Sequence, residues 1–409
     1  MLESYFESEV TLKGLRAGPS GAWLAGFAAS LHAEGYSWWT ARHYLRSANH
    51  LGHFLRRERI AFDTVCSGVI SSFRDHFRRC RCPRPNGGET ENTVRGAKCF
   101  VRHLRRIGIV PEQEEHPWPP LVQGFRRWLR QHRGVSDTTL AHYSQAAIEL
   151  FTKVGSDPGQ YDAQRLRLFL LDRARNRGVG SAKAISSGLR MFLRYLAIGG
   201  ECRAGLDDAI PALAGWRLAS LPSCLSPGEI AQIIEGCGQT SLMELRDRAV
   251  ILLLARLGLR ASDVSALRLG EVDWEDGSLL VKGKSRRESR LPLPQEVGDA
   301  ILAYLKCRPI AQDSHIFLRM VAPLRGLPPR GLSQIVARAM HRAGIVSPSY
   351  GSHILRHAAA TEMLRSGVSL YDIGSVLRHQ SLDMSAYYAK VDVELLKEVV
   401  QPWPEVLSC

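Results

Sequence analysis

The stretch from Gly351 to Asp392 constrains this chain more than any other part of its sequence. Apolar residues recur through Ser352–Arg365 at helical spacing, which predicts an amphipathic helix with a buried apolar stripe. A Ser-x-x-Asp sequence that begins at Ser369 predicts the start of a second helix. After a turn, a third short helix is expected to carry Tyr387 and Tyr388. Three consecutive helices can therefore bring polar side chains from this stretch to one place.

The side chains in this stretch suggest chemistry on a phosphate. His353 and Arg356 are three residues apart and share one face of the first predicted helix, while His379 comes at the end of the second. Arginine offers a fixed fork of donors to phosphate oxygens, histidine shuttles protons near neutral pH, and tyrosine can form a covalent intermediate. A lone His-x-x-Arg pair is usually a solvated face or a core histidine. The added histidine and tyrosine make chance a poor explanation.

The same stretch resembles the C-terminal signature of the tyrosine recombinases, the phage integrase family. That signature reads HxLRH, then LGH, then a nucleophilic tyrosine nine residues after the last histidine; this chain has HILRH, LRH and Tyr388 in those places. The resemblance implies that Tyr388 is the nucleophile and that its neighbour Tyr387 turns away. It also implies catalytic roles for His353, Arg356 and His379.

One position departs from this signature. The glycine that usually precedes the second histidine is Arg378 here, at a predicted helix C-terminus where glycine adopts positive φ at little cost. Arg378 therefore implies either a different helix cap or an additional contact with phosphate.

A second match to the family lies earlier in the chain. The apolar stretch Leu242–Leu257 predicts a buried helix, and GLRASD follows it at residues 258–263. The family has its first catalytic arginine in a GLRxSE sequence, so the resemblance assigns that role to Arg260. Asp263 is placed to hold the Arg260 guanidinium, and a purely structural Asp–Arg pair is the alternative.

Residues 274–293 predict a β-hairpin that follows an Asp-Gly turn. Leu279 and Val281 alternate on its first strand. Lys284 lies at the predicted tip, where the family's hairpin carries a catalytic lysine. A basic hairpin tip is otherwise a solvated turn or a phosphate contact, and the resemblance favours catalysis.

The charge of the chain favours a polyanionic partner. There are 54 Lys and Arg against 40 Asp and Glu, which gives a formal net charge of +14. The arginines cluster in RRERI, RRCRCPRP, VRHLRRIG and FRRWLRQHR, which fall on predicted helices and turns. Together with the resemblance, this charge predicts double-stranded DNA as the partner.

The nine cysteines are irregularly spaced and odd in number, which argues for a reducing compartment and against a disulfide framework. Cys80 and Cys82 with His76 and His103 offer zinc ligands, but their spacing matches no common zinc motif, so no metal is expected. No run of eighteen apolar residues appears, and the N-terminus lacks the basic start and apolar core of a signal peptide. We therefore expect a cytoplasmic protein.

Residues 1–112 and about 113–205 are predicted to be helical, and the second part repeats the plan of the first. The sequence TARHY at 40–44 is echoed by TLAHY at 139–143, an offset of 99 residues. The sequence FVRHL at 100–104 is echoed by FLRYL at 192–196, an offset of 92 residues. These echoes predict two related four-helix units in tandem, although unrelated helical bundles can share such spacings.

These elements predict a mainly α fold with a small antiparallel β-sheet in the C-terminal domain. The expected domains are an N-terminal helical domain at 1–112, a helical domain at 113–215, and a catalytic domain with a C-terminal tail at 216–409. By resemblance, the second is the family's core-binding domain, and the first is an arm or an additional core-binding-like domain. The tail is expected to dock within its own domain or on a neighbouring protomer.

The resemblance implies a site-specific DNA recombinase or integrase of a prokaryotic mobile element. Its tyrosine would form a 3′-phosphotyrosyl bond, with two arginines on the phosphate and Lys284 protonating the leaving 5′-oxygen. No cofactor is expected. The implied partners are double-stranded DNA and further copies of the chain, as a dimer per site and a tetrameric synapse, with sister recombinases as an additional option.

Two other functions stay open. A type IB topoisomerase-like nicking and closing enzyme uses similar residues, but the two preceding helical domains favour a recombinase. A catalytically idle DNA-binding accessory protein fits the charge, but every expected catalytic position holds a suitable residue. Those positions are Arg260, Lys284, His353, Arg356, His379 and Tyr388.

Overall fold

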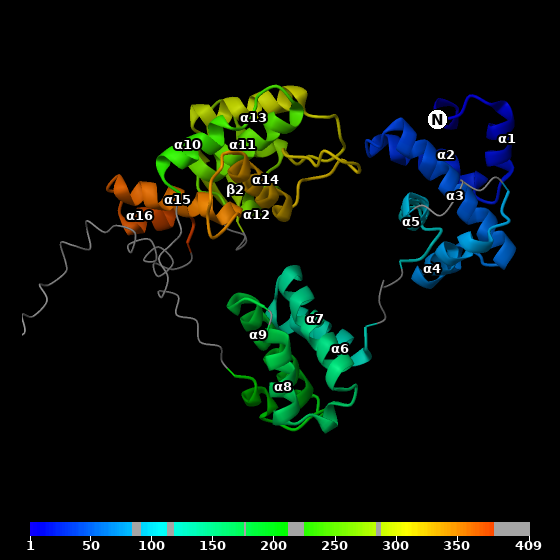
Figure 1. Cartoon of the computed structure of the whole chain (residues 1–409), viewed down its shortest axis with the longest axis horizontal. Helices are drawn as coiled ribbons and strands as arrows, with labels where there is room; N and C mark the ends of the chain where they lie inside the picture. Colours follow the sequence, from blue (N-terminus) through cyan, green and yellow to red (C-terminus); the bar gives the residue numbers. More distant parts are fainter. Residues whose placement is uncertain (84–90, 113–117, 176, 212–224, 284–287, 380–409) are drawn as a thin grey trace, which may run out of the picture. The chain divides into compact units, whose positions relative to one another are not determined.

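The structure, a computed structural model, describes residues 1–83, 91–112, 118–175, 177–211, 225–283 and 288–379. These residues are mostly helical and contain one small antiparallel sheet (Figure 1). The predicted fold class is therefore confirmed. By its contacts the chain divides into two compact units, residues 113–219 and residues 1–112 with 220–409. The expected division into three domains stays a prediction.

The first group of helices, within residues 1–112, packs around its own apolar core. Its helices are α1 Glu9–Ala17, α2 Gly21–Ala33, α3 Trp38–Glu58, α4 Ser67–Asp75 and α5 Glu91–Arg106, with 3-10 turns η1 Leu2–Ser4, η2 Phe62–Thr64 and η3 His76–Arg79. Helix α2 ends at Ala33 and α3 begins at Trp38, so a short turn joins them. The prediction of a four-helix unit is one helix short for this group, which has five among its described residues.

The second group has the four helices that the sequence predicts, around a separate core. They are α6 Pro120–Arg133, α7 Asp137–Val154, α8 Ala163–Ala174 and α9 Val179–Ile198, with 3-10 turns η4 Pro158–Gln160 and η5 Leu206–Ala209. Gly134 ends α6 with a φ of 53°, a conformation that favours glycine. Two residues later, the Ser136 hydroxyl caps α7 by accepting from the Thr139 N–H.

The internal echo of the sequence extends to the packing of these helices. In the first group, Gly96 of α5 lies against Tyr44 and Ser47 of α3, where a Cβ would meet the Ser47 Cβ at 2.7 Å. In the second group, Gly188 of α9 lies against Tyr143 of α7, where a Cβ would meet the tyrosine ring at 3.2 Å. The glycines are 92 residues apart and the tyrosines 99, the offsets found in the sequence. Close helix contact at a glycine is therefore part of the repeat.

The third group contains the remaining helices and the sheet. Its helices are α10 Pro227–Glu235, α11 Leu242–Arg256, α12 Ala261–Ala266, α13 Gln295–Cys307, α14 Pro329–Arg342, α15 Ser352–Arg365 and α16 Leu370–Val376, with the 3-10 turn η6 Leu269–Glu271. Helix α11 is buried along most of its length and packs against α13 and α15, as its apolar sequence predicts. Ser226 and Glu229 form the capping box that starts α10.

The sheet consists of strands β1 Val272–Asp273, β2 Ser278–Lys282 and β3 Glu288–Pro292 in that order. Leu279 pairs with Leu291, and Leu279 and Val281 are both buried, as their predicted alternation on one strand requires. Strand β1 was not predicted; the Asp-Gly turn joins it to β2, with Gly277 at a φ of 57°. The predicted hairpin tip with Lys284 lies outside the described residues.

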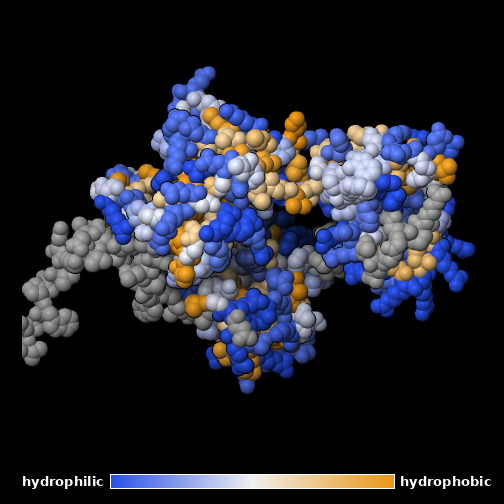
Figure 2. All heavy atoms as spheres, turned by 45° about the horizontal axis from the view of Figure 1, so that its top comes forward, coloured by the Kyte–Doolittle hydropathy of each residue, from blue (hydrophilic) through white to orange (hydrophobic). Residues whose placement is uncertain are grey.

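The two predicted helices that precede the tyrosines are confirmed. Helix α15 has the bounds expected from its apolar stripe, and the Ser369 hydroxyl starts α16 by accepting from the Asp372 N–H. The third predicted helix, with Tyr387 and Tyr388, lies outside the described residues. No helix in the described part of the chain combines the length and apolarity needed to cross a bilayer. The face seen in Figure 2 is largely hydrophilic.

Candidate active site

Two arginines converge on the C-terminal end of α16. Arg356, on α15, is almost fully buried and donates hydrogen bonds to the carbonyls of Gly258 and Leu377, each at 2.5 Å. Arg260, which precedes α12, donates from Nη2 to the carbonyl of Arg378 at 3.1 Å. Because Leu377 and Arg378 are consecutive, both guanidinium groups lie beside the same helix end, where the partial negative charge favours cations. Two motifs far apart in the sequence thus form one positively charged site.

Arg378 ends α16 in the left-handed conformation, with a φ of 55°. Its N–H donates to the Ser375 carbonyl, and the His379 N–H donates to the Gly374 carbonyl, so the last turn closes as it would with glycine. The option of a different cap is therefore wrong. A phosphate contact by Arg378 stays a prediction. Two buried nitrogens of its guanidinium, Nε and Nη1, have no hydrogen-bond partner among the described residues.

The Arg378 side chain pairs with Asp263, whose carboxylate is almost fully buried. The same carboxylate accepts a hydrogen bond from the backbone N–H of Arg260 at 3.2 Å. The prediction that Asp263 holds the Arg260 guanidinium is therefore wrong. Asp263 instead joins the start of α12 to the end of α16, because its Oδ2 accepts from both the Arg260 backbone N–H and the Arg378 guanidinium.

Gly258 allows these elements to approach closely. It lies just after α11 with a φ of 57°, a conformation that residues with a Cβ rarely adopt. A Cβ at this position would lie 2.5 Å from Cδ2 of Leu377. The Gly258 carbonyl also accepts one of the two Arg356 hydrogen bonds. Gly258 therefore allows the close approach between the end of α11 and the end of α16, on which the two arginines converge.

Two predicted site histidines share this charged environment. Burial, followed by the charges of Arg356 and Arg260, lowers the pKa of His379 to about 4. The same causes lower the pKa of His353, although part of its side chain is exposed. Both imidazoles are consequently neutral at neutral pH. A neutral imidazole can donate one N–H to a phosphate oxygen or accept a proton at its other nitrogen.

His357 is a further member of the site that the sequence analysis did not assign. It lies one helical turn after His353, with the two ring centroids 6.4 Å apart. Burial, then His353 and Arg356, lower the pKa of its imidazole. The sequence alone could have indicated His357, because residues four apart, such as His353 and His357, share a helix face.

Comparison with known proteins assigns the chain to a family. The sequence pattern of the phage integrase family matches residues 224–394. A Sinorhizobium fredii protein named as integrase/recombinase y4rA is 32% identical, over 98% of this chain and 99% of that protein. The chain belongs to the phage integrase family. Tyrosine recombinase XerC of Lactobacillus delbrueckii subsp. bulgaricus is 26% identical, over 68% of this chain and 96% of XerC.

The solved structures agree on the fold of this phage integrase family member. The crystal structure of XerH site-specific recombinase bound to a palindromic difH substrate, a post-cleavage complex, matches with a TM-score of 0.55 at 17% identity. The match covers 88% of this chain and 95% of XerH. The helical parts that precede the catalytic region are therefore included in the shared fold.

Four of the six site residues predicted from the family signature lie in the described part of the chain. Arg260, Arg356 and His379 lie at the end of α16, and His353 is close enough to the two arginines for their charges to lower its pKa. The other two, Lys284 and Tyr388, lie outside the described residues, so their roles stay predictions. Within the described residues, a group able to hold a metal occurs away from this site, among residues 1–112. What the site offers is two fixed cations and neutral imidazoles, a set suited to a phosphodiester.

Proposed function

We propose that this chain is a site-specific DNA recombinase that cuts and rejoins duplex DNA through a 3′-phosphotyrosyl intermediate. The observation that carries the proposal is the convergence of Arg260 and Arg356 on consecutive carbonyls at the end of α16, directly before His379. Positively charged, preorganised donors of this kind stabilise a phosphoryl transition state. The relative that matches along the whole chain is itself named as an integrase/recombinase, which supports the proposal.

In the proposed reaction, the Tyr388 oxygen attacks the scissile phosphorus and the bond to the 5′-oxygen breaks. Arg260 and Arg356 bind the non-bridging oxygens as negative charge builds in the pentacoordinate transition state. His353 takes up the tyrosine proton, and Lys284 protonates the leaving 5′-oxygen. The energy of the phosphodiester is retained in the phosphotyrosine, so the 5′-hydroxyl of a partner strand can reverse the attack without a cofactor.

The number of strands sets the number of chains. Exchange between two duplexes cuts four strands, and each chain supplies one nucleophilic tyrosine. Four chains are therefore needed, two on each DNA site and four in the synapse. Because its proposed substrate is DNA, we propose that the enzyme works in the cytoplasm of a prokaryotic cell, on DNA of a mobile element.

The test is covalent trapping on a suicide duplex that carries a nick close to the cleavage site. Cleavage releases a short fragment, so religation fails and the protein–DNA adduct accumulates. The wild-type chain should form an adduct that resists denaturation with detergent. A catalytically idle DNA-binding accessory protein would bind the same duplex and form no adduct, so binding without an adduct would overturn the proposal.

The position of the adduct tests the tyrosine assignment. Adjacent residues on a helix point about 100° apart, so Tyr387 and Tyr388 cannot both face the phosphate. Tyr388→Phe removes only the phenolic oxygen and should eliminate the adduct with DNA binding unchanged. Tyr387→Phe is the matched control and should retain it. DNA attached to Tyr387 in peptide mapping would overturn the assignment.

Two sites on separate plasmids distinguish recombination from a topoisomerase-like activity. A recombinase should join sequences from the two plasmids into one product. An enzyme that only relaxes supercoils and never yields a joined product would instead be a nicking and closing enzyme. The two arms use the same preparation, so the difference cannot come from folding.

A further inference from the structure

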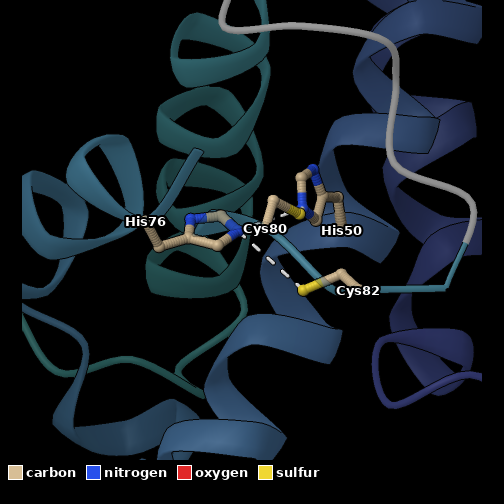
Figure 3. A group of neighbouring side chains, drawn as sticks. All are labelled: His50, His76, Cys80 and Cys82. Carbon is tan, nitrogen blue, oxygen red and sulfur yellow. Dashed lines mark hydrogen bonds between the residues drawn. The ribbon is translucent and has the colours of Figure 1, made fainter. Parts of the chain in front are cut away.

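A cluster of sulfur and nitrogen ligands lies in the first group of helices, separate from the proposed recombination site. It consists of His50, His76, Cys80 and Cys82, whose ligand atoms all lie within 4.8 Å of one another. Figure 3 shows the four side chains pointing toward one another. We propose that these four residues form a structural zinc site, which departs from the expectation that the chain binds no metal.

The four ligands come from separate places in the fold. His50 lies on α3, His76 begins η3 after α4, and Cys80 and Cys82 follow η3. Local sequence alone does not force His50 toward a segment that begins 26 residues later. Packing orients the His50 ring, because the rings of Phe73 and Phe77 each lie 5.3 Å from it, centroid to centroid.

The distances fit a tetrahedral ion. The Nε2 atoms of His50 and His76 are 3.2 Å apart, and the His50 Nε2 is 3.2 Å from the Cys80 sulfur. The Cys82 sulfur is 3.8 Å from the His76 Nε2. Zinc bonds of about 2.0–2.3 Å in a tetrahedron place neighbouring ligand atoms about 3.3–3.8 Å apart. The observed spacing therefore leaves room for one zinc ion with little rearrangement.

The second nitrogen of His76 is already engaged in the way that a zinc ligand requires. His76 Nδ1 donates to the Phe73 carbonyl, which fixes the proton on Nδ1 and leaves a lone pair on Nε2. Metal-bound histidines commonly donate their other ring nitrogen to a carbonyl in this way. The ring also stacks on Phe73 at 5.0 Å, so its orientation is set before any ion arrives.

Hydrogen bonds alone satisfy this cluster poorly. Each Nε2 carries either one proton or one lone pair, yet each one faces both the other Nε2 and a sulfur atom. A zinc ion would bind all four ligand atoms at once, and the two thiol protons would be released to solvent. Two thiolates and two imidazoles are a common donor set for structural zinc, closed to further ligands.

The sequence candidates for zinc included His103 in place of His50. His103 lies instead against Phe27, with ring centroids 5.5 Å apart. The sequence showed no recognisable zinc motif because the fourth ligand, His50, precedes the other three in the chain and lies on a different helix.

The ion would tie η3 and the residues after it to α3. Exposed Arg78, Arg79 and Arg81 lie between those ligands, so the site would fix a basic segment in place.

The first test is the zinc content of the full-length protein, prepared without a metal-binding tag. After addition of excess zinc and removal of unbound ion by gel filtration, elemental analysis should find about one zinc per chain. Cobalt in its place should give the visible spectrum of a tetrahedral thiolate complex. Less than about a tenth of an equivalent of zinc would overturn the proposal. So would a disulfide between Cys80 and Cys82 in protein purified without oxygen.

Matched variants locate the ion. Cys82→Ser and His50→Gln should each lower the zinc content at least tenfold. The controls are Cys66→Ser, another free thiol of this helical group, and His53→Gln, one turn from His50 on α3; both should keep the ion. Zinc retained in a Cys80→Ser, Cys82→Ser double variant with an unchanged circular dichroism spectrum would place the metal elsewhere.

A chelator avoids the concern that a variant fails to fold. Removing zinc from the wild-type chain should lower the melting temperature and increase proteolysis after Arg78, Arg79 or Arg81, and added zinc should restore both. Unchanged proteolysis after verified zinc loss would show that the ion does not hold this segment. These readouts do not depend on recombination, so they stand apart from the proposed function.

Discussion

The Asp263 carboxylate holds the guanidinium of Arg378, a residue that lies 115 positions later and ends α16 in a left-handed conformation. Two effects oppose each other at Arg378. A left-handed residue other than glycine costs about 1–2 kcal/mol, whereas breaking a buried ion pair by removing one partner costs about 3–5 kcal/mol. The ion pair has the larger effect, which explains why arginine is tolerated where glycine fits the backbone better.

Arg378→Gly should therefore destabilise the chain, by about 2 kcal/mol, although glycine suits the backbone. The matched control is Arg59→Gly, because Arg59 ends α3 with a φ of 57° and its exposed side chain makes no hydrogen bond or ion pair within the described residues. That variant should stabilise the chain by about 1 kcal/mol. Urea unfolding of the full-length protein measures both. Stabilisation by both substitutions would show that the Asp263–Arg378 pair contributes little.

The two site arginines should respond differently to truncation. Arg260 is partly exposed, and within the described residues its one side-chain hydrogen bond is to the Arg378 carbonyl, so Arg260→Ala should abolish the covalent adduct and leave stability nearly unchanged. Arg356 is buried, and Arg356→Ala would leave the Gly258 and Leu377 carbonyls without these donors. Its loss should also destabilise the chain, by about 2–5 kcal/mol. Suicide-duplex trapping and urea unfolding, run on both variants, give the two readouts.

Arg356→Lys separates the two roles of Arg356. Lysine keeps the positive charge but cannot donate to two carbonyls from one planar group. The variant should recover part of the lost stability while adduct formation stays low. Full activity in Arg356→Lys would contradict a role that depends on the fork of donors.

Local patterns predicted the elements of this site but not the pairs that join them. Helix α15 follows from its apolar period, and the start of α16 follows from the Ser369 cap, because both signals lie within a few residues. The Asp263–Arg378 pair joins residues far apart, and no period or cap specifies it. The family signature singled out Arg260, which the structure places beside the end of α16, while the partner of Asp263 had to come from the packing of α12 against that helix end.

The proposed zinc site also shows that local sequence patterns do not predict contacts between residues far apart in the chain. Sequence placed Cys80, Cys82 and His76 together because they are neighbours in the chain, and it chose His103 as the fourth residue. The choice of His50 depends on how α3 packs beside the end of α4, which a linear motif does not record. Spacing predicts a ligand set only where all ligands belong to one local unit.

Acid should destabilise the site through His379. Its pKa is about 4 in the folded chain and 6.5 without the influence of the fold. Protonation of His379 therefore favours the unfolded chain. The contribution of neutral His379 to the free energy of unfolding is complete above pH 6.5 and is lost as the pH falls toward 4. His379→Gln should make stability less dependent on pH in this window. Urea midpoints across the window measure this, and equal slopes for the variant and the wild type would contradict the buried, positively charged environment.

DNA binding should depend strongly on salt. If about 6–10 phosphates are neutralised, affinity should fall about 10³–10⁵-fold between 50 and 200 mM salt. Replacing Arg78, Arg79 and Arg81 together by glutamine should reduce the slope of log affinity against log salt by up to about 3. Arg16→Gln is the control, since Arg16 is already paired with Glu3. Fluorescence anisotropy on a labelled duplex measures the slopes, and an affinity that hardly changes with salt would contradict phosphate-dominated binding.

Gly258 offers the sharpest test of how the arginines are positioned. Gly258→Ala meets two obstacles, a φ of 57° and a Cβ that would lie 2.5 Å from the Leu377 side chain. Gly367, after α15, has a φ of 81° and open space around its Cα, so Gly367→Ala meets only the first. Both alanine substitutions should lower the stability of the chain by about 1–2 kcal/mol, because of the left-handed backbone conformation.

Only Gly258→Ala should also displace Leu377, whose carbonyl accepts a hydrogen bond from Arg356. Adduct formation should therefore slow by at least about tenfold, equivalent to 1.4 kcal/mol in the activation barrier. Single-turnover trapping rates, compared at matched stability, decide the matter: equal rates in the two variants would show that the contact between Gly258 and Leu377 does not position the site.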